Sequence, residues 1–294
     1  DLLGKNTDDS DPIAFDLPAL QGESKTLDEH FFRLGSDCAE PFLTYAKDFA
    51  RLNAPPRPRK WIRRSGWTRY APNEEPRAVE APEENMLCFD TEVMWKDNPF
   101  AVMACACSAT AWYAWISPWL LGETKEKTQL VPMGNPTQDR IIVGHNVGFD
   151  RARILEEYNI KQTRNAFLDT MSFHAAVNGM CSQQRPTWMK HKKNRELREQ
   201  AAAQPEDYAL GQLSGSDSAY DEEELWVERS SVNSLRDVAK FHLDVAIDKA
   251  IRDDFGTLER HDIVDKLDEL LDYCAADVSI THRVYQRVFP NFLE

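Results

Sequence analysis

The chain has 294 residues, of which 42% are hydrophobic and 10% aromatic, so it can bury the core of one large domain or of one domain with a satellite. Its formal net charge of −14 argues against a general nucleic-acid binder. The sequence has no apolar run of about 18 residues or more, so we expect no membrane span.

The first 85 residues predict a helical N-terminal extension and a linker. Residues 1–25 are polar, residues 27–52 have helical spacing, and Pro55-Pro56-Arg57-Pro58 ends this helical region. Residues 71–85 are rich in proline and glutamate, which is typical of a linker. We therefore expect an extension over 1–85 and a second domain over 86–294. The candidates for a buried helical stripe are Phe31, Phe32, Leu34, Phe42, Leu43, Ala46 and Phe49.

The remaining chain predicts an α/β fold, a mixed sheet flanked by helices, because its elements follow the order βββαβα. A long amphipathic stretch from Ile263 to Val288 predicts a final helix. Residues 182–229 interrupt this pattern and predict a flexible insertion, whose acid run Asp221-Glu222-Glu223-Glu224 we interpret as solvated. The strands are expected at 86–93, 100–108, 111–117, 140–145 and 166–170, with a loop at 122–138 and helices beginning at 149 and 171.

Six cysteines lie mostly in apolar segments and form no CxxC pair. This pattern predicts free, buried thiols in a reducing compartment. They are Cys38, Cys88, Cys105, Cys107, Cys181 and Cys274.

The most informative feature is the acid pair Asp90 and Glu92, which closes the apolar run Met86-Leu87-Cys88-Phe89. Residues i and i+2 of a strand point to the same face, so both carboxylates are expected to project together. Such a pair favours a divalent metal between its charges. By itself the pair is also compatible with two solvated acids at a strand end.

Two further motifs accompany this pair. Gly144-His145-Asn146-Val147-Gly148-Phe149-Asp150 follows a β-branched strand and places Asp150 in the first turn of a helix. Tyr273 and Asp277 are four residues apart on the final amphipathic helix, so they share one of its faces. Asp169 also follows a strand, and we expect it to be a helix N-cap rather than a fifth metal ligand.

In this order, the motifs Asp90-x-Glu92, Asn146-x-x-Phe149-Asp150 and Tyr273-x-x-x-Asp277 resemble the three exonuclease motifs of the DEDD superfamily. The tyrosine resembles the DEDDy subtype, because the histidine subtype would carry a histidine where Asp272 stands. The resemblance implies a ribonuclease H-like fold and a 3′→5′ exonuclease.

Longer segments are similar to the exonuclease region of the mitochondrial DNA polymerases of the gamma family, and no polymerase motifs follow them. This similarity implies the proofreading part of a replicative enzyme in the mitochondrial matrix. The expected partners are a single-stranded or frayed DNA 3′ end and the polymerase domain of the same protein. The segments are Gly66-Trp67-Thr68-Arg69-Tyr70, residues 144–152, Phe167-Leu168-Asp169-Thr170-Met171-Ser172 and Ser230-Ser231-Val232-Asn233-Ser234-Leu235.

The superfamily resemblance also implies how the site works. Asp90, Glu92, Asp150 and Asp277 would hold two divalent cations, and oxygen ligands favour Mg²⁺, with Mn²⁺ possible, over zinc. Tyr273 would orient the attacking water through its hydroxyl. Because a free phenol has a pKa near ~10, neutral hydrogen bonding is favoured over proton abstraction.

The resemblance assigns substrate contacts to Asn146 and Phe149. Asn146 would hydrogen-bond the terminal nucleotide, and Phe149 would pack against a sugar or base. Core packing at a helix start remains an equal alternative for Phe149, and a surface tyrosine remains the alternative for Tyr273.

Basic residues gather in two clusters that partly offset the acidic net charge. The first, Arg51 to Tyr70, has no acid and interleaves cations with Trp61, Trp67 and Tyr70, which suits a groove for a single strand. The second lies between Lys190 and Arg198. Solvated loops, or contacts to a polymerase domain, are the alternatives for both clusters.

Two other functions share part of this pattern. An RNA-directed DEDD exonuclease would use the same residues, and a non-catalytic exonuclease-like interaction module would keep only the fold. The presence of Asp90, Glu92, Asp150, Asp277 and Tyr273 argues against the non-catalytic module.

Overall fold

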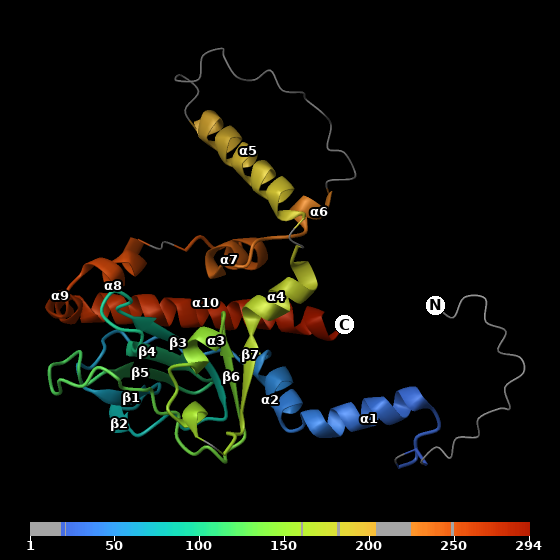
Figure 1. Cartoon of the computed structure of the whole chain (residues 1–294), viewed down its shortest axis with the longest axis horizontal. Coiled ribbons are helices and arrows are strands. Elements are labelled where there is room, and N and C mark those ends of the chain that lie inside the picture. Colours follow the sequence, from blue (N-terminus) through green and yellow to red (C-terminus); the bar gives the residue numbers. More distant parts are fainter. Residues whose placement is uncertain (1–18, 21, 160, 181–182, 204–224, 248–249) are drawn as a thin grey trace, which may run out of the picture. The chain divides into compact units, whose positions relative to one another are not determined.

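The computed structural model describes residues 19–20, 22–159, 161–180, 183–203, 225–247 and 250–294 (Figure 1). The chain forms two compact units, Asp1–Leu43 and Thr44–Glu294.

In the first unit, helix α1 spans Leu27–Ala39 and begins at the N-cap Thr26, whose hydroxyl accepts a hydrogen bond from Glu29 N at 3.2 Å. No residue of α1 is buried, and the side chains of Phe31 and Phe32 are exposed. The predicted buried stripe is therefore wrong for these two residues, because the described part of this unit has no second layer of structure to cover them.

The expected helical stretch 27–52 is divided into α1 and α2 (Phe42–Phe49), with Pro41 between them. Proline lacks the N–H that a continuous helix would need. Within the second unit, the end of α2 packs on the last helix, α10 (Leu267–Leu293). The Tyr285 hydroxyl donates to Ala46 O at 2.7 Å, and the Phe49 and His282 rings lie 4.4 Å apart.

The second unit contains a seven-stranded mixed sheet in the order β2-β1-β5-β4-β3-β6-β7. β3, β6 and β7 run parallel to their neighbours in this group, and the other pairings are antiparallel. The predicted mixed sheet flanked by helices is confirmed. The strands are β1 (Gly66–Tyr70), β2 (Arg77–Val79), β3 (Met86–Val93), β4 (Ala101–Cys107), β5 (Trp112–Ile116), β6 (Arg140–Gly144) and β7 (Asn165–Asp169).

Strands β1 and β2 lie before residue 86 and still belong to this sheet. β1 pairs with β5, and β2 pairs with β1, where Val79 lies opposite Trp67. The expected linker over 71–85 is therefore wrong for residues 77–79. A short edge strand is held by main-chain hydrogen bonds and needs no apolar sequence, so composition alone does not reveal it. The division of the chain at residue 86 stays a prediction.

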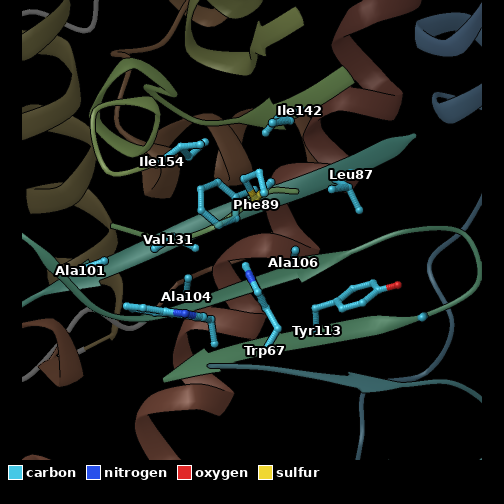
Figure 2. Close-up of a cluster of buried hydrophobic side chains, with 13 residues drawn as sticks. Trp67, Leu87, Phe89, Ala101, Ala104, Ala106, Tyr113, Val131, Ile142 and Ile154 are labelled. Carbon is cyan, nitrogen blue, oxygen red and sulfur yellow. The ribbon is translucent and has the colours of Figure 1, made fainter. Parts of the chain in front are cut away.

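The sheet separates two apolar layers. Figure 2 shows Trp67, Phe89, Tyr113 and Ile142 in the layer on one face, which loop residues such as Val131 complete. Helix α10 covers the opposite face, where Cys88 Sγ donates to Val278 O at 3.3 Å and Cys105 Sγ to Leu271 O at 3.7 Å. The alternating directions of strand side chains therefore fill both layers.

Of the other helices, α3 contacts β3, and α4, α7 and α9 contact α10 (Figure 1). α5 falls in the predicted insertion and was not expected, whereas residues 204–224, with the acid run at 221–224, lie outside the described residues. The helices are α3 (Gly148–Arg151), α4 (Thr170–Asn178), α5 (Arg185–Ala203), α6 (Leu225–Glu228), α7 (Leu235–Leu243), α8 (Asp254–Thr257) and α9 (Arg260–Asp265).

All the described cysteines are free thiols. Cys88, Cys105, Cys107 and Cys274 are buried as predicted, whereas Cys38 is exposed. Cys181 lies outside the described residues. Across the described parts of the chain, every helix is too short or too polar to cross a bilayer.

Candidate active site

Strand β3 directs Asp90 and Glu92 to the face of the sheet that α10 covers. Cys88, two residues earlier, contacts α10 through Val278 O, so alternation places the next two even-numbered side chains on the same side. The register of β3 against β4 shifts between Glu92 and Val93, so that Glu92 lies opposite Met103 and Val93 opposite Ala101. The predicted projection of both carboxylates to one face is confirmed.

Asp150 reaches this point from the neighbouring strand. β6 runs parallel to β3, and the short helix α3 that follows it carries Asp150, which is 2% exposed. Its Oδ1 accepts hydrogen bonds from Thr91 N at 3.0 Å and from Thr91 Oγ1 at 2.6 Å. Thr91, which lies between the first two acids, therefore fixes the third.

Helix α10 supplies Tyr273 and Asp277, which are both buried. The two side chains are one turn apart, and burial, followed by the negative charge of Asp277, raises the pKa of the Tyr273 hydroxyl. Cys274, next to Tyr273, places its Sγ 3.8 Å from Asp90 Oδ2. The helix thereby brings its motif directly against the acids of β3.

Burial and nearby charges shift the pKa values of two of these carboxylates, Asp90 and Asp150. Burial raises the pKa of Asp90 well above its usual range, and the negative charges of Asp150, Glu92 and Asp277 raise it further. Burial also raises the pKa of Asp150 to about 7, although the hydrogen bonds from Thr91 oppose this shift. Oxygen atoms of like charge gathered out of water are the donor set that a hard divalent cation neutralises.

Asn146 and Phe149 lie at the mouth of the same site. Asn146 has a left-handed backbone, with φ of 59°, and its side chain is exposed. Phe149 is 42% exposed, and the guanidinium carbon of Arg153 lies 3.5 Å from the centre of its ring. Core packing of Phe149 is therefore wrong, and its ring stays available to a ligand.

All seven predicted site residues line one groove of about 990 Å³. Sequence reasoning missed Trp95, whose indole is 48% exposed in this groove, and also Arg236 and Arg252. A single residue after a strand, or an arginine outside a cluster, has no spacing pattern that marks it. The seven residues are Asp90, Glu92, Asn146, Phe149, Asp150, Tyr273 and Asp277.

The first basic cluster has a structural role. Trp61, Trp67 and Tyr70 are all buried, so they cannot stack on bases. Arg57 and Arg63 donate to the carbonyls of Asp272 and Val264, which ties this segment to the helical layer. The expectation that these aromatics stack on a single strand is thus wrong, because they belong to a packed strand and its flank. A DNA contact of the basic residues in this cluster stays a prediction.

The second basic cluster reaches the groove through α5. Lys192 lines the groove and forms an ion pair with Asp237 at 2.7 Å. Its ammonium also lies 5.5 Å from the ring centre of Trp188, whose indole donates to Ser230 O. Arg185, at the start of α5, lines the same groove and adds a second cation.

The mixed sheet, with carboxylates on its strand β3, on the short helix that follows β6 and on helix α10, defines an exonuclease domain of the ribonuclease H-like fold. Residues 11–292 match the family described as the DNA mitochondrial polymerase exonuclease domain, and the chain belongs to this family.

Three relatives illustrate the similarity. DNA polymerase gamma, mitochondrial, of Neurospora crassa is 65% identical over 100% of this chain and 20% of that protein. DNA polymerase gamma of Saccharomyces cerevisiae is 40% identical over 100% of this chain and 22% of that protein. DNA polymerase subunit gamma-1 of Xenopus laevis is 34% identical over 100% of this chain and 26% of that protein. The chain thus spans only about a fifth to a quarter of their lengths.

Proposed function

We propose that this chain is a metal-dependent 3′→5′ exonuclease that removes nucleotides from DNA 3′ ends as the proofreading part of a mitochondrial replicative polymerase. The observation that carries the proposal is the convergence of Asp90, Glu92, Asp150 and Asp277, with Tyr273, in the groove of an exonuclease-family domain. The names of the relatives support a mitochondrial location, for which we propose the matrix, and the polymerase domain of the same protein as a partner.

The same four carboxylates would hold two divalent cations, Mg²⁺ or Mn²⁺. The donor set fits them, because hard cations prefer carboxylate oxygens and because the unneutralised cluster raises the pKa of Asp90. When bound, the cations supply an activated water and neutralise the charge that develops on the leaving 3′ oxygen.

Tyr273 would orient the attacking water as a neutral phenol. Burial raises the pKa of its hydroxyl, and the charges of Asp277, Glu92 and Asp90 raise it further, so the proton stays on the phenol at neutral pH. A hydroxyl that keeps its proton can donate one hydrogen bond and accept another. Tyr273 thereby positions a water without serving as the base.

Asn146 and Phe149 would hold the terminal nucleotide. The exposed amide of Asn146 can donate to and accept from the nucleotide, and the open face of Phe149 can pack against a sugar or base. Arg185, Arg236 and Arg252 add positive charge to the groove wall and suit contacts to phosphates. Because the net charge is −14, we expect weak DNA binding unless the polymerase delivers the frayed end.

The decisive experiment follows digestion of a 5′-labelled single-stranded DNA oligonucleotide, with Mg²⁺ and with EDTA, by the parent chain and by its Asp90→Asn variant. We expect a ladder that shortens from the 3′ end, requires the metal and is absent in the variant. A matched RNA oligonucleotide that is degraded faster would favour an RNA-directed exonuclease. A folded parent protein that binds Mg²⁺ but degrades neither substrate would support an interaction module instead.

A further inference from the structure

The loop between β6 and α3 holds Asn146, the proposed nucleotide contact, in an unfavourable backbone conformation. Asn146 lies in the left-handed region, which costs an L-residue roughly 1–2 kcal/mol, although asparagine tolerates it better than most side chains. Something outside the loop must therefore stabilise this conformation if the Asn146 amide is to keep one direction in the groove.

Asp169, the last residue of β7, provides that stabilisation. Its Oδ1 accepts a hydrogen bond from Asn146 N at 2.7 Å and another from Met171 N at 3.1 Å, and its Oδ2 accepts one from Ser172 Oγ at 2.9 Å. The carboxylate is thus the N-cap of α4, as predicted, and at the same time an anchor for the loop. Gly144 and Asp169 form the last pair between the parallel strands β6 and β7. The position of the Asp169 carboxylate is therefore fixed by the sheet.

His145, the residue before Asn146, is held by contacts on both sides of the groove. His145 Nε2 lies 2.8 Å from Asn233 O, which can only accept, so this nitrogen carries the proton. His145 Nδ1 then lies 2.9 Å from the Thr170 hydroxyl, next to Asp169 in the chain. Two successive loop residues are therefore tied to the β7–α4 junction, and one of them also to the segment that precedes α7.

We infer that Asp169 is a positioning residue that fixes the backbone of Asn146 and so determines how the terminal nucleotide is held. The inference rests on the proposed function, because it assigns Asn146 to the nucleotide. Asp169 touches neither the four clustered carboxylates nor Tyr273 in any described contact. Its effect therefore passes through Asn146 and is separate from metal binding.

The test uses Asp169→Ser in the full chain. Serine is as good an N-cap as aspartate, so α4 keeps its cap. Its single, shorter oxygen cannot also reach Asn146 N. We expect the melting temperature to change little. KM for a single-stranded DNA 3′ end should rise about fivefold to tenfold, and kcat should stay within about twofold. This pattern is expected because the lost interaction binds the substrate and the transition state equally. Amide exchange at Asn146 should also become faster.

Two further variants show whether Asp169 acts through Asn146. Ser172→Ala removes only the bond to Oδ2 and should leave KM unchanged. Asn146→Gly keeps the left-handed backbone without the amide, so adding Asp169→Ser to it should raise KM no further. Additive effects in the double variant, or an unchanged KM and unchanged exchange in Asp169→Ser, would overturn the inference alone. A parent chain without exonuclease activity would contradict the proposed function and this inference with it.

Discussion

At the scale of single residues, the clustered acids of the groove suit a bound cation, but they destabilise the protein when no cation is bound. Asp90 is surrounded by Glu92, Asp150 and Asp277, and burial adds to the cost of its charge. Residues placed this way lower the free energy of unfolding until a cation or proton neutralises them. The same feature that makes this cluster a candidate metal site therefore predicts a measurable trade-off.

The variant Asp90→Asn tests this trade-off. In EDTA we expect it to be more stable than the parent by about 1–2 kcal/mol, because a neutral amide replaces a repelled charge. With Mg²⁺ its exonuclease rate should fall on the order of 100-fold or more. Denaturant unfolding and oligonucleotide digestion measure the two effects. The exposed Asp48→Asn variant changes the net charge equally and should show neither effect; equal stabilisation there would contradict the local explanation.

At the scale of elements, the strand that carries Asp90 and Glu92 could be predicted from the sequence. The observed β3 has the predicted bounds 86–93, because its apolar run and terminal acids mark both of its ends. β2 could not be recognised, because an edge strand of three residues has no periodicity. Trp95 lies two residues after the end of β3, and only the folded chain brings it into the groove. The spacing of residues in the sequence therefore predicted the site residues that share one helix or strand. It missed those that only tertiary packing brings into the groove.

The short helix α8 sets the position of Trp95. A Cβ added to Gly256 would lie 1.9 Å from Trp95 Cζ2, so no other residue type fits there without moving the indole. Because aromatic stacking of a base contributes about 1–3 kcal/mol, we expect Trp95→Ala to weaken single-stranded DNA binding by about fivefold or more. Gly256→Ala should weaken it in the same direction by displacing the ring.

Fluorescence anisotropy with a labelled oligonucleotide, in the Asp90→Asn background to prevent digestion, measures this binding. Gly35→Ala is the matched control, because its added Cβ would meet no atom within 4 Å. If Trp95→Ala binds as tightly as the background protein, the indole does not contact DNA. If only Gly256→Ala weakens binding, the helix α8 acts by another route than Trp95.

At the scale of the whole molecule, two titratable groups, Asp150 and His242, make the stability depend on pH in opposite directions. Asp150, with a pKa raised to about 7, binds protons more readily in the folded state, so in the absence of metal it adds stability as the pH falls below about 7. His242 acts in the opposite direction, since burial, His174 and Arg287 lower its pKa to about 4. A pH profile of the parent chain therefore mixes both effects.

The variant His242→Gln separates them. His174 Nε2 lies 3.2 Å from the Ser231 carbonyl and must donate to it, so His174 Nδ1 accepts from His242 Nε2 at 2.9 Å. Glutamine can replace that donor but cannot titrate. Unfolded histidine binds a proton below about 6.5 and His242 only below about 4, so the parent loses stability as the pH falls through this window.

The free energy of unfolding is measured with denaturant at pH 8 and at pH 4.5. Relative to the parent, His242→Gln should gain about 1–2 kcal/mol of stability at pH 4.5, a value reduced because the imidazole is only partly buried. The contribution of Asp150 cancels, because both proteins carry it. His261→Gln, at a side chain that is 77% exposed, is the matched control. If the control shows the same pH-dependent gain, or if His242→Gln shows none, the buried histidine pair does not limit acid stability.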